Sequence, residues 1–468
     1  MRYLNKTLAT IAALTMSAAL LGACSPAKSA DFSAASASAT SPSWAAKSVI
    51  YEVNVRDYSD SGKLTAVTSD IPRLKKLGID ILWLMPIYPI GETSRKGSMG
   101  SPYSVKDYKA VNPDLGTDAD LHSLIDTAHA AGMHVVLDWV ANHTAFDNAW
   151  ITDHPDWYNH DAQGNPTWPA GTDWTDVADL NYDNQNMRAA MVDAMKYWVT
   201  NFDIDGYRCD AAWGVDTAFW ETATTALRAI KPVWMVAETQ DQADLLANAF
   251  QADYGWHFKD MLYGFGAGTG QKSDFSMAMN AQAMAYPTGT YPMLFITNHD
   301  ENSWTGSLST QFGKGAKTLS VLTFTVPGMP LIYNGQEVDS NRRLAFFEKD
   351  LIDWNLTSAR SKAAVAFYTK LISLRHKNPA LWAGVSGGTM TRYKNDTTRV
   401  VSFSRQKGAN KVYIVLNISP LAAVGKVQWG ADSKYYYRYS DGKRVKLPAT
   451  QTVSLKPWGF EIYSTVKP

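Results

Sequence analysis

The chain has 468 residues, enough for two or three domains and a large hydrophobic core. Its 44 Lys and Arg residues balance its 44 Asp and Glu residues, so the formal net charge at pH 7 is zero. This balance argues against nucleic acid or another polyanion as the partner. The 17 Trp and 23 Tyr residues mostly suit a packed core, but they also suit a neutral ligand with apolar faces, such as a sugar ring.

The N-terminal residues 1–24 have the pattern of a secretion signal. The basic stretch Met1–Lys6 precedes the apolar run Leu8–Leu21, which is too short to span a bilayer comfortably. The run leads into Leu-Gly-Ala-Cys24, which resembles a bacterial lipobox, whose Cys becomes the lipidated first residue. Residues 25–44 are rich in Ala and Ser and predict a flexible tether. We therefore expect a protein of the cell envelope, lipid-anchored on the periplasmic side or the outer-membrane surface. An ordinary secretion signal that contains Cys is the alternative.

Strand-like and helix-like patterns alternate from Val49 onward, which predicts a parallel α/β fold. The clearest helix has apolar residues at helical spacing from Leu121 to Ala128, a capping Thr117 and a terminal Gly132. Other helices are expected at Ile71–Leu77, Asn186–Asn201, Lys314–Thr325 and Ala363–His376. Strands are expected at Ser48–Val55, Ile81–Met85, His134–Val140, Gly206–Asp210, Val233–Ala237, Met293–Thr297 and Leu331–Tyr333.

The alternation breaks at two places. Residues 144–185 are rich in Trp, Asp, Pro, Gly and Asn without a steady period, and such a segment is usually functional or a small inserted domain. Beyond about residue 381, short β-type runs such as Val400–Phe403 and Val412–Leu416 alternate with turn residues. Residues 381–468 therefore predict a C-terminal antiparallel β-sandwich.

Four carboxylate-bearing segments end strand-like runs, in the order Asp138–His143, Gly206–Asp210, Val236–Glu238 and Phe295–Asp300. Strand ends that all deliver charged side chains are typical of the active face of a (β/α)₈ TIM barrel, here expected over residues 45–380. In this order and spacing, the segments resemble the signature segments of the α-amylase family of retaining glycoside hydrolases (glycoside hydrolase family 13). The resemblance covers residues 48–468. It implies an inserted domain B within 144–185 and catalysis without a cofactor.

The resemblance assigns the catalytic carboxyls to Asp210, Glu238 and Asp300. A retaining glycosidase uses one carboxyl as nucleophile and another as acid and base. Asp210 is the expected nucleophile, because Arg208 projects from the same strand face and would keep it ionised. Glu238 ends an apolar run, a setting that suits a general acid. Asp300 would orient sugar hydroxyls and stabilise the transition state. The structural alternatives are an Arg–Asp ion pair, a Glu at a helix N-terminus and a metal cluster at Asn298–Asp300.

The resemblance also implies a substrate-binding set. Tyr103 would stack on a sugar ring, His143 and His299 would hydrogen-bond sugar hydroxyls, and Asp138 would support the site without doing chemistry. Arg343 is a candidate for a neighbouring sugar subsite. The full predicted set of substrate-binding residues is Tyr103, His143, Arg208, Trp213, His299 and Arg343.

Two departures from the family pattern concern the leaving side and calcium. Many α-amylases have a Lys-His pair after the nucleophile, where this chain has Trp213 and Gly214. Asn142 and Asp179 match family calcium ligands, but two side chains fall short of the about six to eight oxygens that calcium takes. A structural calcium ion is therefore a weaker expectation than the glucan site.

The sequence as a whole predicts a monomeric hydrolase that cleaves α-1,4-glucosidic bonds in starch, glycogen or maltooligosaccharides. A 4-α-glucanotransferase and a cyclomaltodextrinase or neopullulanase are the alternatives of the same kind, because only the acceptor or the preferred substrate differs. A catalytically inactive glucan-binding lipoprotein is the alternative from another class, but it has no use for three intact carboxyls. Cys209 is expected to be a small buried hydrophobe, not a nucleophile.

Overall fold

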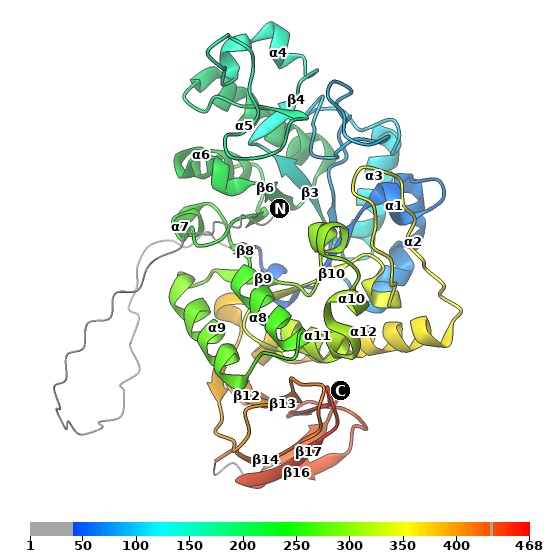
Figure 1. Cartoon of the computed structure of the whole chain (residues 1–468), viewed down its shortest axis with the longest axis vertical. Coiled ribbons are helices and arrows are strands. Elements are labelled where there is room, and N and C mark those ends of the chain that lie inside the picture. Colours follow the sequence, from blue (N-terminus) through cyan, green and yellow to red (C-terminus); the bar gives the residue numbers. More distant parts are fainter. Residues whose placement is uncertain (1–40, 431–433) are drawn as a thin grey trace, which may run out of the picture. The chain divides into compact units, whose positions relative to one another are not determined.

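The computed structural model describes residues 41–430 and 434–468, and a closed barrel is its central feature (Figure 1). The barrel has eight strands in the order β1-β10-β9-β8-β7-β6-β3-β2, and its strand pairs are parallel. The strands are β1 Ile50–Val53, β2 Ile81–Leu84, β3 His134–Val140, β6 Gly206–Asp210, β7 Trp234–Ala237, β8 Ala252–Tyr254, β9 Tyr291–Leu294 and β10 Met329–Tyr333. The predicted (β/α)₈ barrel is confirmed.

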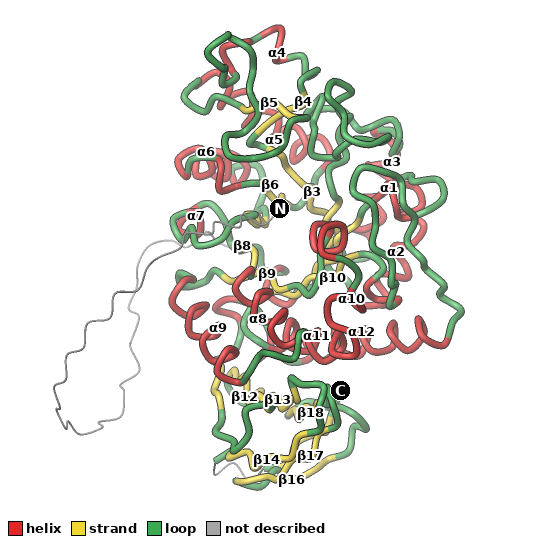
Figure 2. Tube along the Cα trace, in the orientation of Figure 1, coloured by secondary structure: helices red, strands yellow, loops and turns green. Residues whose placement is uncertain are grey.

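Helices alternate with the strands and surround the barrel (Figure 2). They are α1 Val55–Tyr58, α2 Leu64–Leu77, α3 Asp118–Ala130, α5 Gln185–Phe202, α6 Thr217–Arg228, α7 Leu245–Asn248, α8 Trp256–Gly266, α9 Lys272–Ala285, α10 Leu308–Phe312, α11 Ala316–Thr325 and α12 Ala359–Lys377. The predicted cap of α3 is present, because Thr117 and Asp120 exchange side-chain hydrogen bonds with each other's backbone N–H groups. Helix α2 ends at Gly78, whose φ of 107° favours glycine.

Successive residues of the barrel strands belong to two different apolar clusters. Ile50, Trp83, Val236, Tyr254 and Phe295 belong to a cluster of inward-facing side chains that fills the barrel. Their neighbours along the strands belong to a larger cluster shared with the helices. The strands that contribute to both clusters are apolar on both faces, as expected for a parallel sheet covered by helices.

Strand β8 is the barrel strand that the sequence does not predict. It has only three residues, and three residues are too few to show a period. Its two neighbours in the barrel are β7 and β9. It contributes Tyr254, whose importance becomes clear at the active site.

The segment between β3 and α5 forms the insert. Strands β4 His143–Ala145 and β5 Val177–Asp179 pair in antiparallel fashion, with His143 opposite Asp179. The chain between them includes the short helix α4 Trp150–Asp153 and the 3₁₀ turn η2 Pro155–Trp157. This small sheet places insert residues close to the end of β3.

The C-terminal part is the expected antiparallel structure. Its strands are β11 Thr389–Arg392, β12 Val400–Lys407, β13 Asn410–Asn417, β14 Ala423–Gln428, β15 Tyr435–Arg438, β16 Arg444–Lys446, β17 Thr450–Leu455 and β18 Phe460–Ser464. Six of them form one sheet in the order β11-β12-β13-β18-β15-β16, and β14 pairs with β17. Tyr413, Val427 and Val453 share one apolar cluster and join the two sheets.

The predicted secretion signal, Cys24 and most of the predicted tether lie outside the described residues. The last residue of that tether, Trp44, stacks on His134 with ring centroids 3.8 Å apart. Among the residues that the structure describes, no helix is both long and apolar enough to cross a membrane. Cys209 is buried on β6, as expected.

Candidate active site

The strand register brings charged residues together at the carboxyl end of the barrel. Strands β3 and β6 pair with Asp138 opposite Arg208. Strands β6 and β7 pair so that the penultimate residue of β6 lies opposite the last residue of β7. The residues that follow this pair in the chain are Asp210 and Glu238. Their side chains therefore emerge next to each other.

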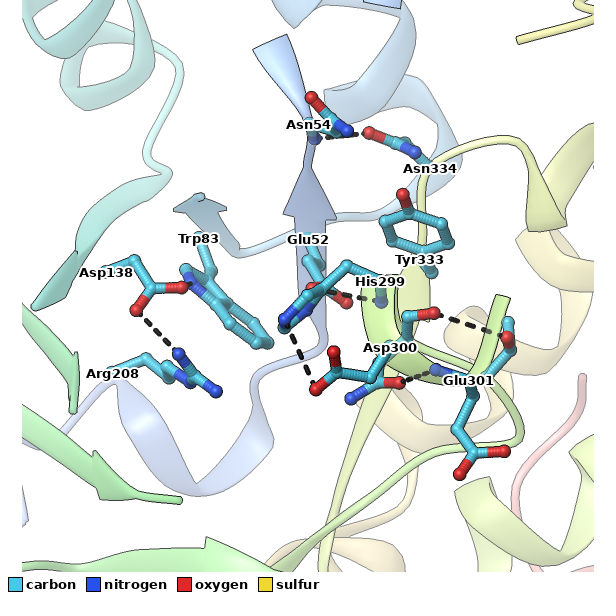
Figure 3. Close-up of polar contacts among 12 residues, drawn as sticks. Glu52, Asn54, Trp83, Asp138, Arg208, His299, Asp300, Glu301, Tyr333 and Asn334 are labelled. Carbon is cyan, nitrogen blue, oxygen red and sulfur yellow. Dashed lines mark hydrogen bonds and ion pairs between the residues drawn. The ribbon is translucent and has the colours of Figure 1, made fainter. Parts of the chain in front are cut away.

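Arg208 is the centre of this cluster and is fully buried. Figure 3 shows its contact with Asp138. Its Nη1 atom donates to Asp138 Oδ1 at 2.8 Å and to Asp210 Oδ1 at 2.9 Å, and its Nε atom donates to the Tyr254 hydroxyl at 2.9 Å. Its Nη2 atom lies 2.9 Å from Glu238 Oε2, an ion pair outside hydrogen-bond geometry. One guanidinium thus holds two carboxyls close together, as double displacement at one glycosidic bond requires.

The surroundings of Asp210 favour its protonated form. Burial raises the pKa of Asp210 well above its ordinary value, and the neighbouring Glu238 and Asp138 raise it further, while Arg208 opposes them. Arg208 favours the ionised form of Asp210, as expected, but it does not outweigh burial and the other carboxyls that share this cation. Such a proton belongs to the group of carboxyls rather than to one of them. A retaining mechanism needs one protonated and one ionised carboxyl, and a raised proton affinity in this cluster fits that need.

Asp300 lies beside a charged histidine. His299 Nδ1 is 2.5 Å from Glu52 Oε1, and His299 Nε2 is 2.8 Å from the Tyr103 hydroxyl and 3.5 Å from Asp300 Oδ2. Burial lowers the pKa of His299, but the charges of Asp300 and Glu52 outweigh it and raise the pKa to about 9. Burial raises the pKa of Asp300, yet His299 and Arg208 hold it below its ordinary value. Asp300 is therefore ionised at neutral pH.

Asp138 supports the site through hydrogen bonds to its neighbours, as expected from the sequence. Its Oδ2 atom accepts hydrogen bonds from Trp83 Nε1 at 3.1 Å and from the Tyr103 hydroxyl at 3.0 Å. Tyr103 therefore links Asp138 to His299, and its ring stacks on Phe346 with centroids 6.0 Å apart. Asp138 is fully buried, so it orients Arg208 and Tyr103 rather than contacting a substrate.

His143 has the opposite charge state from His299. Burial lowers the pKa of His143 to about 4, so its ring is neutral at neutral pH. The Asn142 amide donates to His143 Nδ1 at 3.3 Å, which assigns the proton of the ring to Nε2. The site thus combines one neutral and one cationic imidazole, and both suit hydroxyl groups as partners.

Aromatic side chains flank the carboxyls. Trp174 lies 5.4 Å from the His143 ring and 6.3 Å from the ring of Trp213, which is 41% exposed. Trp304, after Asp300, is 42% exposed and packs on Phe346 at 5.4 Å. Exposed Trp faces at a carboxyl cluster fit sugar rings, whose C–H faces are apolar.

Arg343 is placed differently from the other predicted residues. It is exposed, and its Nε atom donates to the Ser303 carbonyl at 2.7 Å. Arg343 therefore braces the turn that follows Asp300.

The side chains of the two predicted calcium ligands are both hydrogen-bonded to protein neighbours. Asp179 Oδ2 accepts from Asn159 Nδ2 at 2.7 Å, and the Asn142 amide is turned to His143. A Cβ atom at Gly214 would lie 2.3 Å from Asn142 Oδ1, so a bulkier residue at 214 would move Asn142. In residues 41–430 and 434–468, no group of three or more His, Cys, Asp or Glu side chains is placed to hold a metal ion.

Glu52, Trp83, Tyr254 and Trp304 are site residues that the sequence did not reveal. Glu52 is fully buried in the apolar strand β1, and a lone Glu inside such a strand is the signal that could have found it. Tyr254 belongs to the strand that was missed. Trp83 and Trp304 cannot be told from core aromatics by sequence alone.

Two carboxyls held side by side are the arrangement that glycoside hydrolases use, and the Arg208-centred cluster has this arrangement. Within that class the chain belongs to the α-amylase family, because the family model "Alpha amylase, catalytic domain" matches residues 49–358. Carboxyl groups alone carry catalysis in such enzymes, which need no cofactor.

Similar proteins agree with this assignment. The α-amylase MalA of Haloarcula japonica is 28% identical over 402 residues, which cover 80% of this chain and 56% of MalA. The cyclomaltodextrinase of Geobacillus thermopakistaniensis is 25% identical over 431 residues, which cover 86% of this chain and 70% of that enzyme. The crystal structure of the maltogenic α-amylase AmyB from Thermotoga neapolitana matches 90% of this chain and 99% of AmyB, with a TM-score of 0.79 and 29% identity. This chain thus spans little more than half the length of MalA and nearly all of AmyB.

Proposed function

We propose that this protein hydrolyses α-1,4-glucosidic bonds in starch, glycogen or maltooligosaccharides as a monomer, with retention of configuration. The single observation that carries the proposal is the contact of Asp210 and Glu238 with one buried guanidinium, that of Arg208. The names of the similar proteins supply the substrate class. The ionised Asp300 beside them is placed to stabilise positive charge that develops on the sugar.

In the first step, a carboxylate oxygen of Asp210 attacks the anomeric carbon. Glu238 donates its proton to the glycosidic oxygen as the bond to the leaving sugar breaks. The product of this step is a glucosyl ester of Asp210 and a free sugar. Glu238 is left as a carboxylate.

In the second step, Glu238 takes a proton from a water molecule. The water oxygen attacks the anomeric carbon, the ester bond to Asp210 breaks, and both carboxyls return to their starting states. Two inversions give net retention. The neutral His143 and the cationic His299 lie at this site, and sugar hydroxyls are their proposed partners.

The test is cleavage of maltoheptaose by the wild type and by the variants Asp210→Asn and Glu238→Gln. Both substitutions keep shape and remove charge or acidity, and acid–base help alone contributes about 10²- to 10⁴-fold. Asp205→Asn is the matched control, since Asp205 is a buried Asp just before β6, at the opposite end of the strand from Asp210. Loss of activity in both site variants and its retention in the control supports the proposal. Wild-type turnover in either folded site variant contradicts it.

Transglycosylation is the second candidate activity, and the Trp213–Trp174 pair favours it. An aromatic face near the leaving sugar can hold a second sugar, whose hydroxyl then replaces water in the second step. We expect transfer products at high oligosaccharide concentration and a lower ratio of transfer to hydrolysis in Trp213→Ala. An unchanged ratio means that Trp213 only packs.

We also propose that the protein is exported and anchored in the cell envelope by a lipid on Cys24. The lipobox-like Leu-Gly-Ala-Cys24 and the Ala/Ser-rich segment after it support this. In a bacterial host that processes lipoproteins, Cys24→Ser should move the protein from the membrane fraction to the soluble fraction. A variant that stays with the membranes contradicts the anchor.

A further inference from the structure

Asp300 has a buried charged residue on each side of it in the chain. His299 pairs with Glu52 at 2.5 Å. Glu301 is 5% exposed and pairs with Lys259 of helix α8, whose Nζ atom is 3.2 Å from Glu301 Oε2. Lys259 is fully buried, and the contact is an ion pair outside hydrogen-bond geometry. Figure 3 shows Glu301 following Asp300 in the chain but lying apart from Arg208.

Gln311 of helix α10 connects Lys259 to the turn that follows Asp300. This turn is the π-helical turn η4, Glu301–Thr305. Lys259 Nζ donates to Gln311 Oε1 at 3.0 Å. Gln311 Nε2 donates to the carbonyl oxygens of Glu301 at 3.2 Å and Gly306 at 2.6 Å. Lys259 therefore contacts the start of the turn directly, through the Glu301 carboxylate. Through Gln311 it is linked to the carbonyls at both ends of the turn.

The turn presents two side chains to the site. Asp300 is the residue before its first position, and Trp304 is its fourth residue. The Trp304 indole lies close enough to the Asp300 carboxylate to help to hold the pKa of Asp300 below its ordinary value. The Glu301 backbone N–H also donates to Asn298 Oδ1 at 2.8 Å, which fixes the start of the turn. π-helical turns are rare and are frequently found at functional sites.

Stability alone gives a poor reason for such a pair. Removing two charges from water costs several kcal/mol for each ion, and well-packed apolar residues of the same volume often stabilise a fold as well or better. The Lys259 ammonium lies 3.9 Å from the Tyr263 ring centroid and 4.7 Å from that of Phe312, so an apolar partner would pack there. What the charges add is a single preferred geometry for the turn.

We propose that Lys259 and Glu301 are a positioning pair, which fixes the π-helical turn so that Asp300 meets the sugar in its transition-state geometry. The inference rests on the proposed function, since it assigns Asp300 a role in glycoside cleavage. Neither residue touches the substrate. They act through Asp300 and Trp304.

The test compares the full-length wild type with Glu301→Gln, Lys259→Met and the double variant, by kcat and KM on maltoheptaose. Glu301→Gln keeps the shape of the side chain and removes its charge. Because a displacement of about 1 Å can cost about 10²-fold in rate, kcat should fall by about 10- to 100-fold. The fall in kcat should exceed any rise in KM that a displaced Trp304 causes, because Asp300 acts mainly in the transition state. The double variant should lose no more than the worse single variant, since both changes break one pair.

Glu337→Gln is the matched control. Glu337 is a fully buried carboxylate paired with Arg73 at 3.0 Å, and the Tyr51 hydroxyl donates to it at 2.6 Å. Its loss should lower stability and leave kcat of the folded enzyme unchanged. If Glu301→Gln behaves in the same way, the pair is merely structural and the proposal is overturned.

A crystal structure of Glu301→Gln gives a readout that does not depend on the substrate. A displaced Asp300 and Trp304 support the positioning role, and unchanged side chains overturn it. This separates the proposal from the proposed function, which fails by itself if the wild type does not cleave maltoheptaose. If Glu301→Gln does not fold, the double variant, which leaves no unpaired charge, takes its place in both measurements.

Discussion

Replacing Arg208 with Lys tests the electrostatic design of the site without removing its positive charge. The guanidinium uses three nitrogen atoms on four partners, namely Asp138, Asp210, Glu238 and Tyr254. A Lys ammonium is a single point donor and cannot reproduce the planar fork. At least the Tyr254 hydrogen bond and one carboxylate contact are lost.

The expected loss follows from these contacts. Hydrogen bonds to charged groups contribute about 1.5 to 3 kcal/mol each, and removing a partner from a buried ion pair costs about 3 to 5 kcal/mol. Because the charge is kept, we expect Arg208→Lys to lower the free energy of unfolding by about 3 kcal/mol. Misplacement of Asp210 relative to Glu238 should lower kcat by about 10²-fold or more.

Urea unfolding followed by circular dichroism measures the first effect, and maltoheptaose cleavage by the folded variant measures the second. Arg405→Lys is the control, because Arg405 is also buried and donates to the carbonyls of Gly388, Thr325 and Trp382 in a part of the chain remote from the catalytic strands. It should lose stability and keep kcat. A folded Arg208→Lys enzyme with wild-type kcat would refute the reasoning.

Three further predictions concern single side chains. The pKa of His299 is raised from 6.5 to about 9, so its stabilising effect is complete below pH 6.5 and is lost as the pH rises through 9. Wild-type protein should therefore lose on the order of 3 kcal/mol more unfolding free energy over this range than His299→Gln does, by urea titration at each pH. A parallel loss in both proteins would contradict the charged imidazole. Glu52→Gln removes the carboxylate that stabilises the charge of His299, so activity should decline at a lower alkaline pH than in the wild type. The pH profile of kcat/KM measures this shift, and an unchanged profile would contradict the pairing of Glu52 with His299. Trp304→Ala should raise KM for maltoheptaose more than it lowers kcat if the indole face binds a sugar ring, and steady-state kinetics with KM unchanged would exclude that role.

The sequence predicts the barrel and its carboxyls because both depend on local patterns. Apolar strands ending in Asp210 and Glu238 are visible in a window of a few residues, and parallel strands must deliver their ends to the same edge. Strand β8 was missed because three residues carry no period. The sequence predicted part of the six-stranded C-terminal sheet, from apolar runs such as Val400–Phe403 and Val412–Leu416, but not the strands β14 and β17 of the second sheet.

The contacts around Asp300 could not be predicted from the sequence. Glu52 meets His299 across 247 positions, and Lys259 meets Glu301 from another helix. Such pairs arise only when the barrel closes, so no spacing rule predicts them. The proton affinity of Asp210 has the same origin, because it depends on how many carboxyls converge on Arg208 after folding.

The measurement that tests the central claim most directly is the configuration of the first product. Proton NMR during the first minutes of maltoheptaose cleavage distinguishes the α- and β-anomers before mutarotation mixes them. If Asp210 attacks the anomeric carbon and Glu238 acts as acid and then base, the new reducing end appears first as the α-anomer. A β-anomer that appears first would mean single displacement by water, and would contradict the roles of Asp210 as nucleophile and Glu238 as acid and base.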